Sequence, residues 1–332
     1  MAGLDELPDA VAIARLVRDV TEREPRNPRP LGSGVTTIAW RVETDDGPLV
    51  VLLQKPDAAR ARATAGIGDI PPRFGAQLAI FDALDDRVPR AVAWSGDHEH
   101  ESTARIQLPW AIVGEAEGAP GAADDLNLEA ARDLGGWLAR LHALPAEGLG
   151  LLEDRRDRLT GTAPDTASAL LERWPGLWPF DGTSLLSHPI ARVAPRTIEP
   201  ASRFREAILR FGLLTRGVVL HSDLNPNHLY LRDGRMVTVI DFSDAFIGPP
   251  AADFAVLASH FGWDRVEAIL EGYTESVVLR ETRLAEAQLF GVALGLYRVR
   301  KRVALGQERE RIERDVLHLG DTIERAAHLL RG

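Results

Sequence analysis

The feature that most constrains this chain is a pair of aspartates, Asp223 and Asp241, on either side of a short hairpin pattern. Asp223 follows a short apolar run, and Asp241 ends the second of two further apolar runs. Asp233-Gly234 lies between those two runs, and Asp-Gly at such a place is typical of a tight hairpin turn. The predicted strands are residues 218–220, 229–231 and 236–240. The hairpin would bring both carboxylates to the same edge of a small sheet.

Two carboxylates at one edge match the needs of phosphoryl transfer. One carboxylate orients and deprotonates the accepting hydroxyl, and another holds the metal that bridges the nucleotide phosphates. The alternative is that two apolar strands end in Asp by coincidence. A single Asp at a strand end is common, whereas an ordered pair with an intervening hairpin is much rarer. The pattern therefore favours a catalytic interpretation.

The motifs His221-x-Asp223 and Ile240-Asp241-Phe242 resemble the catalytic and metal-binding segments of protein kinases. They resemble those of the aminoglycoside phosphotransferase family still more closely, and the similarity runs from the Gly32 turn to about Asp253. It implies an α+β, protein-kinase-like fold of two lobes. The N-lobe would be an antiparallel sheet with one helix, and the C-lobe would be mostly helical. With a boundary near Glu115, we expect the N-lobe at residues 1–114 and the C-lobe at residues 115–332.

The resemblance also assigns roles to the central residues. Asp223 would act as the general base or would orient the acceptor hydroxyl, and Asp241 would bind Mg²⁺ through a carboxylate oxygen. His221 would shape the catalytic loop through hydrogen bonds rather than take up a proton. Asp253 would brace that loop, and His142 would be a packed structural histidine.

A departure from the usual family pattern occurs at His228, five residues after Asp223. The second metal ligand at that position is usually Asn, and imidazole is a less typical Mg²⁺ ligand. Asn225 or Asn227 could take over this role if the loop shifts in register. Macrolide phosphotransferases and one branch of aminoglycoside phosphotransferases also have His there. Those branches tend to accept GTP, so the expected phosphoryl donor is ATP or GTP.

The N-terminal part contains a weaker nucleotide-binding pattern at Gly32-Ser33-Gly34. These residues lie in the turn between two predicted strands, where glycines let a backbone approach phosphates. Ser33 would add hydroxyl or amide donors. Thr37 occupies the place of the third glycine in the full kinase pattern, and a Gly-x-Gly turn alone is more often only a hairpin.

Lys55 follows the predicted strand 49–54, where kinases carry a lysine that grips the phosphates. Strict alignment would put Leu53 at that point, so Lys55 is either the phosphate-binding lysine or a solvated residue at a strand end. Its expected glutamate partner on helix 72–84 is replaced by Gln77. Asp82 is a less suitable substitute for that glutamate. The only other lysine is in the basic run 298–302, which we interpret as a solvated helix face.

Two further segments are candidates for ligand contacts. The backbone of Gly114 to Ala116 would form the hinge between the lobes and pair with the purine edge. Residues 146–200 are irregular and rich in proline, and aromatic residues concentrate there. Such aromatics usually form core beneath a loop, but the resemblance implies an acceptor-binding insertion, with Trp178 and Phe180 as part of an acceptor wall.

Composition limits the class of protein. The 332 residues are enough for two lobes, and the absence of cysteine fits a reducing compartment. The first 16 residues are neither a secretory signal nor a membrane anchor, so we expect a soluble, cytoplasmic protein without a membrane partner. A net charge of -10 argues against a nucleic-acid partner and is compatible with a cationic acceptor.

The leading hypothesis is a small-molecule kinase that transfers the γ-phosphoryl group of ATP or GTP, with Mg²⁺, to a hydroxyl. Because His228 matches the antibiotic branches, the expected acceptor is an aminoglycoside or a macrolide, with antibiotic resistance as the consequence. One alternative is a metabolic kinase of the same fold that acts on choline, homoserine or a sugar. Another is a nucleotide-binding pseudokinase, which Thr37, Gln77 and His228 favour.

Overall fold

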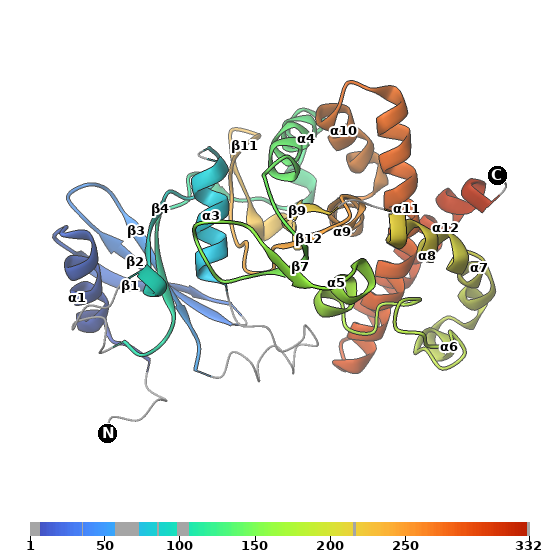
Figure 1. Cartoon of the computed structure of the whole chain (residues 1–332), viewed down its shortest axis with the longest axis horizontal. Coiled ribbons are helices and arrows are strands. Elements are labelled where there is room, and N and C mark those ends of the chain that lie inside the picture. The colour runs from blue at the N-terminus through green and yellow to red at the C-terminus, as the bar shows by residue number, and fades with distance from the viewer. Residues whose placement is uncertain are drawn as a thin grey trace.

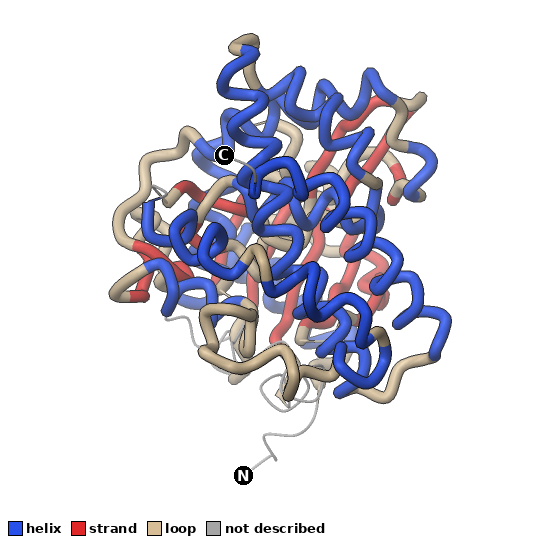
Figure 2. The backbone as a smooth tube through the Cα atoms, turned by 90° about the vertical axis from the view of Figure 1, so that its right-hand side faces the viewer, coloured by secondary structure: helices blue, strands red, loops and turns tan. Residues whose placement is uncertain are grey.

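The computed structural model describes residues 7–34, 36–56, 73–84, 86–97, 106–214 and 217–330. Figure 1 shows a sheet-containing part at one end and a mostly helical part at the other, with α1 and α12 at opposite ends. In the view turned by 90°, helices lie in front of the strands (Figure 2). The predicted α+β, two-lobed fold is confirmed, and no helix among the described residues is long and apolar enough to cross a bilayer.

The N-terminal part is built on a five-stranded antiparallel sheet with the order β1-β2-β3-β5-β4. One helix covers each face of this sheet. Alternate side chains of β3 point to opposite faces, so this strand contributes to the packing on both. Leu49, Val51 and Leu53 pack on the α1 side, whereas Val50 packs with α3. The elements are α1 (Ala10–Thr21), β1 (Arg26–Ser33), β2 (Thr37–Glu43), β3 (Leu49–Gln54), α3 (Phe74–Leu84), β4 (Ala91–Trp94), η1 (Ser95–Asp97) and β5 (Trp110–Gly114).

The remaining part combines helices with two small sheets, of order β11-β10-β6 and β8-β7-β12-β9. Its strands are β6 (Ala119–Pro120), β7 (Leu149–Leu152), β8 (Gly161–Ala163), β9 (Val218–Leu220), β10 (Leu229–Arg232), β11 (Arg235–Val239) and β12 (Phe246–Gly248). Its α-helices are α4 (Leu128–His142), α5 (Thr166–Arg173), α6 (Ile190–Val193), α7 (Ile198–Ser202), α8 (Arg205–Leu214), α9 (Ala251–Phe261), α10 (Trp263–Tyr273), α11 (Val277–Ala304) and α12 (Arg309–Ala326). Short 3₁₀ turns are η3 (Ala123–Asp125), η4 (Pro195–Thr197), η5 (Pro226–His228) and η6 (Ala327–Leu330).

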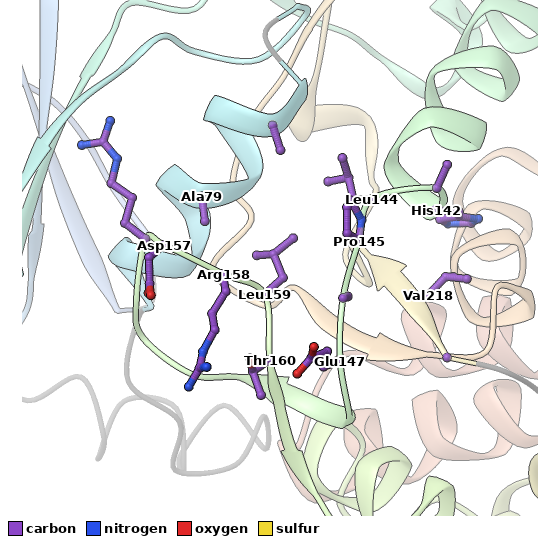
Figure 3. A pocket seen from close by; sticks show the side chains of 15 residues that line it. Ala79, His142, Leu144, Pro145, Glu147, Asp157, Arg158, Leu159, Thr160 and Val218 are labelled. Carbon is purple, nitrogen blue, oxygen red and sulfur yellow. The ribbon is translucent and has the colours of Figure 1, made fainter.

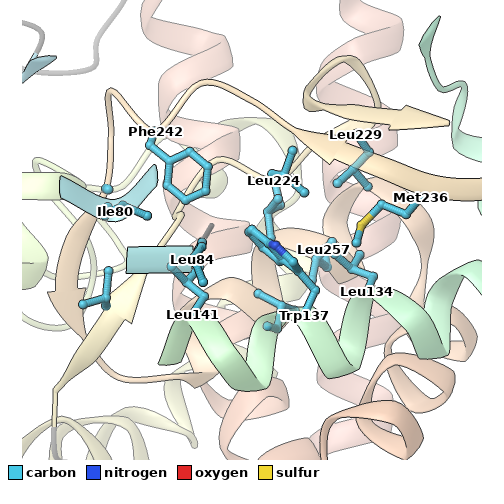
Figure 4. Packing of buried hydrophobic residues seen from close by; sticks show 14 of the residues in the cluster. Ile80, Leu84, Leu134, Trp137, Leu141, Leu224, Leu229, Met236, Phe242 and Leu257 are labelled. Atoms are coloured by element: carbon cyan, nitrogen blue, oxygen red, sulfur yellow. The ribbon is translucent and has the colours of Figure 1, made fainter. Parts of the chain in front are cut away.

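One hydrophobic core packs around Trp137 of α4 (Figure 4). Leu224 and Phe242 follow Asp223 and Asp241 in the chain, and both are buried around Trp137 of α4. The ring of Phe242 meets that of Trp137 edge-on, with 6.1 Å between the ring centroids. Asp223 and Asp241 are thus each next to an apolar residue that anchors the backbone in the core.

Helices α4 and α10 approach each other so closely that their backbones touch. A Cβ atom placed at Gly135 would lie 1.9 Å from the carbonyl oxygen of Ile269, and one at Gly272 would lie 1.8 Å from that of Arg132. Glycine is therefore needed at both contact points, because any side chain would separate the helices. The next residue along α4, Gly136, has far more room, since its nearest atom would be 3.7 Å away.

His188, between α5 and α6, makes stability depend on pH. Its side chain is buried, with 4% of the residue exposed, and its Nδ1 accepts a hydrogen bond from the Ile190 N–H at 3.1 Å. Burial, reinforced by Arg300, lowers the pKa of His188 from 6.5 to about 4. As pH falls below 6.5 the unfolded chain takes up a proton that the folded chain refuses, so His188 removes stability between about pH 6.5 and pH 4.

We expect His188→Asn to weaken this pH dependence, because the amide oxygen keeps the hydrogen bond to Ile190 and does not titrate. Between pH 7 and pH 5 the variant should lose about 2 kcal/mol less unfolding free energy than the parent chain. Urea denaturation at the two pH values measures this difference. Equal losses in both proteins would show that His188 is protonated in the folded state at pH 5.

Candidate active site

Asp223 and Asp241 converge on one imidazole, that of His228. The Oδ2 atom of Asp223 lies 3.6 Å from His228 Nδ1, and Oδ2 of Asp241 lies 3.4 Å from Nε2. The β10–β11 hairpin produces this arrangement through a two-residue turn. Asp233 and Gly234 both have positive φ, 52° and 74°, as a type I′ turn requires. The two acids therefore share one edge of the small sheet, as the hairpin pattern predicts.

The catalytic loop is held from below by Asp253 of α9, which is fully buried. Its two carboxylate oxygens accept hydrogen bonds from the N–H groups of His221 at 3.1 Å and Ser222 at 2.7 Å. His142 of α4 lies 3.2 Å from the same carboxylate through Nε2. These contacts stabilise Ser222 at φ 63°, a left-handed conformation that is unfavourable for a residue with a side chain. Asp253 and His142 thus occupy the supporting positions that the sequence predicts.

His221 links the two loops and stays neutral. Its Nε2–H donates to the carbonyl oxygen of Ile240 at 2.9 Å, and its Nδ1 accepts from the N–H of Asp223 at 3.3 Å. Burial, together with the neighbouring His228, lowers the pKa of His221 to about 4. Both ring nitrogens are engaged and the ring resists protonation, so this geometry suits a positioning role rather than proton transfer.

Asp223 has the properties of a base. Its carboxylate is 42% exposed, yet it lies low in a concave site surrounded by protein atoms. Burial raises the pKa of Asp223 to about 6, while His228 opposes the shift and Asp244 adds to it. A carboxylate with a raised pKa accepts a proton more readily than an ordinary surface Asp.

The residues near Asp241 fit a magnesium ion. His228 Nδ1 lies 2.8 Å from the backbone oxygen of Asp223 and 3.0 Å from the side-chain nitrogen of Asn225, and Nε2 lies 3.4 Å from the Asp241 carboxylate. In the tautomer with the proton on Nδ1, the Nε2 lone pair faces that carboxylate, and a cation between the two would relieve the repulsion. No group of three His, Asp or Glu side chains among the described residues could hold a metal alone. Mg²⁺ commonly uses one or two protein ligands together with phosphates and water, which matches this pair.

The two asparagines are less well placed to replace His228. The side-chain oxygen of Asn225 already accepts a hydrogen bond from the N–H of Asn227 at 3.0 Å. Its amide nitrogen lies 3.1 Å from the carbonyl oxygen of Asp223, and Asn227 is exposed. His228 is therefore the residue of this loop that faces Asp241.

The glycine turn and Lys55 lie together at the tip of the N-terminal sheet. Lys55 Nζ donates to the carbonyl oxygen of Gly34 at 2.5 Å. Leu53, the residue that strict alignment selects, is buried on the α1 face. Gln77 of α3 is buried, and no side-chain contact joins it to Lys55 among the described residues. Gly32, Ser33, Gly34 and Lys55 stay predictions for phosphate binding.

The hinge prediction needs one correction, at Gly114. The N–H of Gly114 donates to the carbonyl oxygen of Arg90 at 2.8 Å, and the N–H of Glu115 donates to that of Pro48 at 3.3 Å. These amides are bound within the sheet, so they are not available to a purine. The amide of Ala116 and the carbonyl groups of the segment stay candidates.

Comparison with known proteins identifies the family. A model of the phosphotransferase enzyme family matches residues 28–285, more than half of the chain. The chain belongs to this phosphotransferase family. As a member of that family it is a phosphotransferase. A comparison with curated proteins finds no match.

Solved structures share the fold of the phosphotransferase at low sequence identity. One is a thermostable mutant of aminoglycoside phosphotransferase APH(4)-Ia in a ternary complex with ADP and hygromycin B (13% identity, TM-score 0.58, 95% of this chain and 96% of that chain). Another, from Thermobifida fusca, is assigned as a fructosamine-3-kinase (21% identity, TM-score 0.58, 95% and 98%). A third is ADP-bound aminoglycoside phosphotransferase APH(2'')-Ib (18% identity, TM-score 0.54, 96% and 99%).

The prediction that Trp178 forms part of an acceptor wall of the phosphotransferase is wrong. This residue is 2% exposed and belongs to the core that α5, α8 and α11 enclose, so it has almost no surface for an acceptor. Phe180 packs against the same core and is only half-buried, so its role stays a prediction.

Sequence reasoning missed the surface that does lie beside Asp223. A cavity of about 260 Å³ there is lined by Asp223, Ser222 and Asp244, by Arg173 and by one face of α11. The contribution of α11 includes Arg298, Lys301 and Arg302, from the basic run interpreted as a solvated face. Lysine is rare in this arginine-rich chain, and that rarity could have marked Lys301 as a candidate site residue, as it did Lys55.

A larger cavity, of about 780 Å³, lies elsewhere (Figure 3). It is lined by α3, by the chain after α4 and by the start of β9, with His142, Arg158 and Val218 among its walls. Neither Asp223 nor Asp241 borders it. The smaller cavity borders Asp223, the predicted base, and is therefore the candidate acceptor site.

Proposed function

We propose that this phosphotransferase transfers the γ-phosphoryl group of ATP or GTP to a hydroxyl of a small molecule, with Asp223 as the base. The observation that carries the proposal is the convergence of Asp223 and Asp241 on His228, with Asp223 also lining a cavity. Asp241 and His228 would hold Mg²⁺, which neutralises phosphate charge when bound. Lys55 and the 32–34 turn would contact the phosphates, and Ala116 would contact the purine.

The chemical step follows from these positions. The acceptor oxygen attacks the γ-phosphorus, and its proton passes to the carboxylate of Asp223. A new phosphorus–oxygen bond forms while the bond from the γ-phosphorus to the β–γ bridging oxygen breaks, and that oxygen leaves with the electron pair as part of ADP or GDP. His221 and Asp253 keep the loop in place during transfer, since they bind its backbone directly.

For the acceptor, the cavity favours the metabolic alternative over an antibiotic. Its volume of about 260 Å³ is below the range of roughly 300–1,000 Å³ that is usual for drug-sized ligands. Cationic side chains line it, which disfavours a polycationic aminoglycoside. The antibiotic hypothesis from His228 stays a prediction that the same experiment tests.

The experiment is a nucleotide-turnover assay with ATP and with GTP against a panel of acceptors. The panel contains aminoglycosides, macrolides, choline, homoserine, sugars and sugar acids, and growth of expressing cells on antibiotics is scored in parallel. Acceptor-dependent ADP or GDP release that Asp223→Asn abolishes supports the proposal. If nucleotide raises the Tm but no acceptor is phosphorylated, the pseudokinase alternative replaces it.

A further inference from the structure

The cavity beside Asp223 has two walls of different character. One wall is the catalytic machinery, with Asp223 and Ser222 on the loop and Asp244 just after the metal-binding segment. The other wall is one face of the long helix α11, which contributes Arg298 and Lys301 one turn apart. An acceptor that presents its hydroxyl to Asp223 would therefore lie against α11.

Part of the positive charge around the cavity is already neutralised. Arg173, which is almost fully buried, forms an ion pair with Asp244 at 3.0 Å and donates to the Ser222 hydroxyl at 2.7 Å. This pair leaves no net charge, and it fixes the conformation of the catalytic loop. It therefore serves the protein itself and supplies no charge for a ligand.

The charge on α11 is not neutralised in this way. Arg298 and Arg302 share a single buried carboxylate, that of Asp315, at 3.2 Å and 3.0 Å. Their other nitrogen contacts are to the Ser259 hydroxyl and, at 3.4 Å, His260 Nε2 for Arg298, and to the Gln307 side-chain oxygen for Arg302. One positive charge of this group is left without a carboxylate.

Lys301 adds a second positive charge, and with the carboxylate of Asp223 in the same cavity one net positive charge remains. Within the part of the chain that the structure describes, its ammonium group forms no hydrogen bond and no ion pair. Burial, with Arg173 next in importance, lowers the pKa of Lys301 to about 8, against the opposing effect of Asp223 and Asp244. A cation in such a place is costly unless an anion accompanies it. A ligand anion would supply the missing partner.

We propose that this cavity, walled by Asp223 and the basic face of α11, binds acceptors through a carboxylate or phosphate group held by Lys301. The inference rests on the proposed function, because it takes Asp223 as the residue that receives the hydroxyl proton. The acceptor is then a small hydroxy acid or a phosphorylated alcohol. The chain is acidic as a whole, with a net charge of -10, yet its acceptor cavity is locally basic.

The test compares related acceptors with and without an anionic group. The pairs are glycerate with glycerol, gluconate with sorbitol, and glycerol 3-phosphate with glycerol, each assayed with the preferred nucleotide. We expect the anionic member of at least one pair to have a kcat/KM at least tenfold higher than its neutral partner. Comparing the carboxylates with the phosphate ester shows which anion the cavity prefers.

Variants then assign the preference to Lys301. Lys301→Met should raise KM for the anionic acceptor about tenfold or more. Lys301→Arg keeps the positive charge, so its KM should stay close to that of the parent chain. Arg309→Gln is the matched control, because it removes one positive charge from an α12 side chain that is 90% exposed and pairs only with Glu313 among the described residues. A Lys301→Met effect no larger than that of Arg309→Gln would overturn the proposal, as would preference for the neutral acceptors.

A binding measurement separates this inference from the proposed function. Isothermal titration calorimetry of gluconate and of inorganic phosphate is carried out with a non-hydrolysable ATP analogue present. If no acceptor is phosphorylated but these anions bind and Lys301→Met weakens them, the kinase proposal fails and the anion site stands. If acceptors are phosphorylated but anions bind equally well to both proteins, the kinase proposal stands and the anion site is rejected.

Discussion

Replacing Asp223 by Asn lowers kcat for the acceptor reaction by about 10²- to 10⁴-fold, the range expected for loss of a positioned general base. The amide has nearly the same size as the carboxylate but cannot take the acceptor proton. His228 still donates to the backbone oxygen of residue 223, so the loop keeps its conformation. Steady-state kinetics on an active acceptor from the panel measures the fall in kcat. The shift in Tm on adding nucleotide shows whether the folded site is retained.

Asp233→Asn is the matched control for this variant. Asp233 is an exposed carboxylate at the tip of the β10–β11 hairpin, and asparagine tolerates its positive φ of 52° well. The same chemical change should leave kcat within about twofold there, since surface substitutions away from special features have small effects. A normal kcat in Asp223→Asn would remove Asp223 from the mechanism.

The largest effect on stability is expected for Gly135→Ala at the contact between α4 and α10. The new methyl group would overlap the carbonyl oxygen of Ile269, where only 1.9 Å is available, so one helix must shift. Overpacking of this kind costs about 3 kcal/mol or more when the obstacle is backbone. Chemical denaturation or calorimetry should show a Tm lower by several degrees.

Gly136→Ala provides the comparison, one residue further along the same helix. Its methyl group would be 3.7 Å from the nearest atom, an ordinary van der Waals distance. Alanine favours helix over glycine by about 1 kcal/mol, so this variant should be as stable as the parent or more stable. Equal destabilisation by the two substitutions would mean that helix packing at Gly135 is not the cause.

Local sequence patterns were sufficient for the central motif and its strands, but not for residues 146–200, which were expected to be irregular but contain β7, β8, α5, α6 and the start of α7. Apolar runs predicted β9, β10 and β11, and Asp233-Gly234 predicted the turn that positions Asp241. These features depend on residues that are near one another in the chain, where periodicity and turn preferences apply directly.

The errors occurred where long-range packing decides the outcome. Trp178 is buried because α8 and α11 cover it, which is the alternative of a core beneath a loop that its aromatic-rich segment had left open. The Gly114 amide is occupied because the chain places Arg90 opposite it. Lys301 lies far from Asp223 in sequence, and only the fold brings α11 to the catalytic loop. Single-sequence patterns do not contain these pairings.

The division of this active centre between separate elements has an evolutionary consequence. Asp223 and Asp241 are held by α9 and by the core around Trp137, whereas the opposite wall of the cavity is a face of α11. If this cavity holds the acceptor, as proposed, substitutions on that face alter acceptor preference while the supports of both aspartates stay in place. That is a route to divergence open to a duplicated gene.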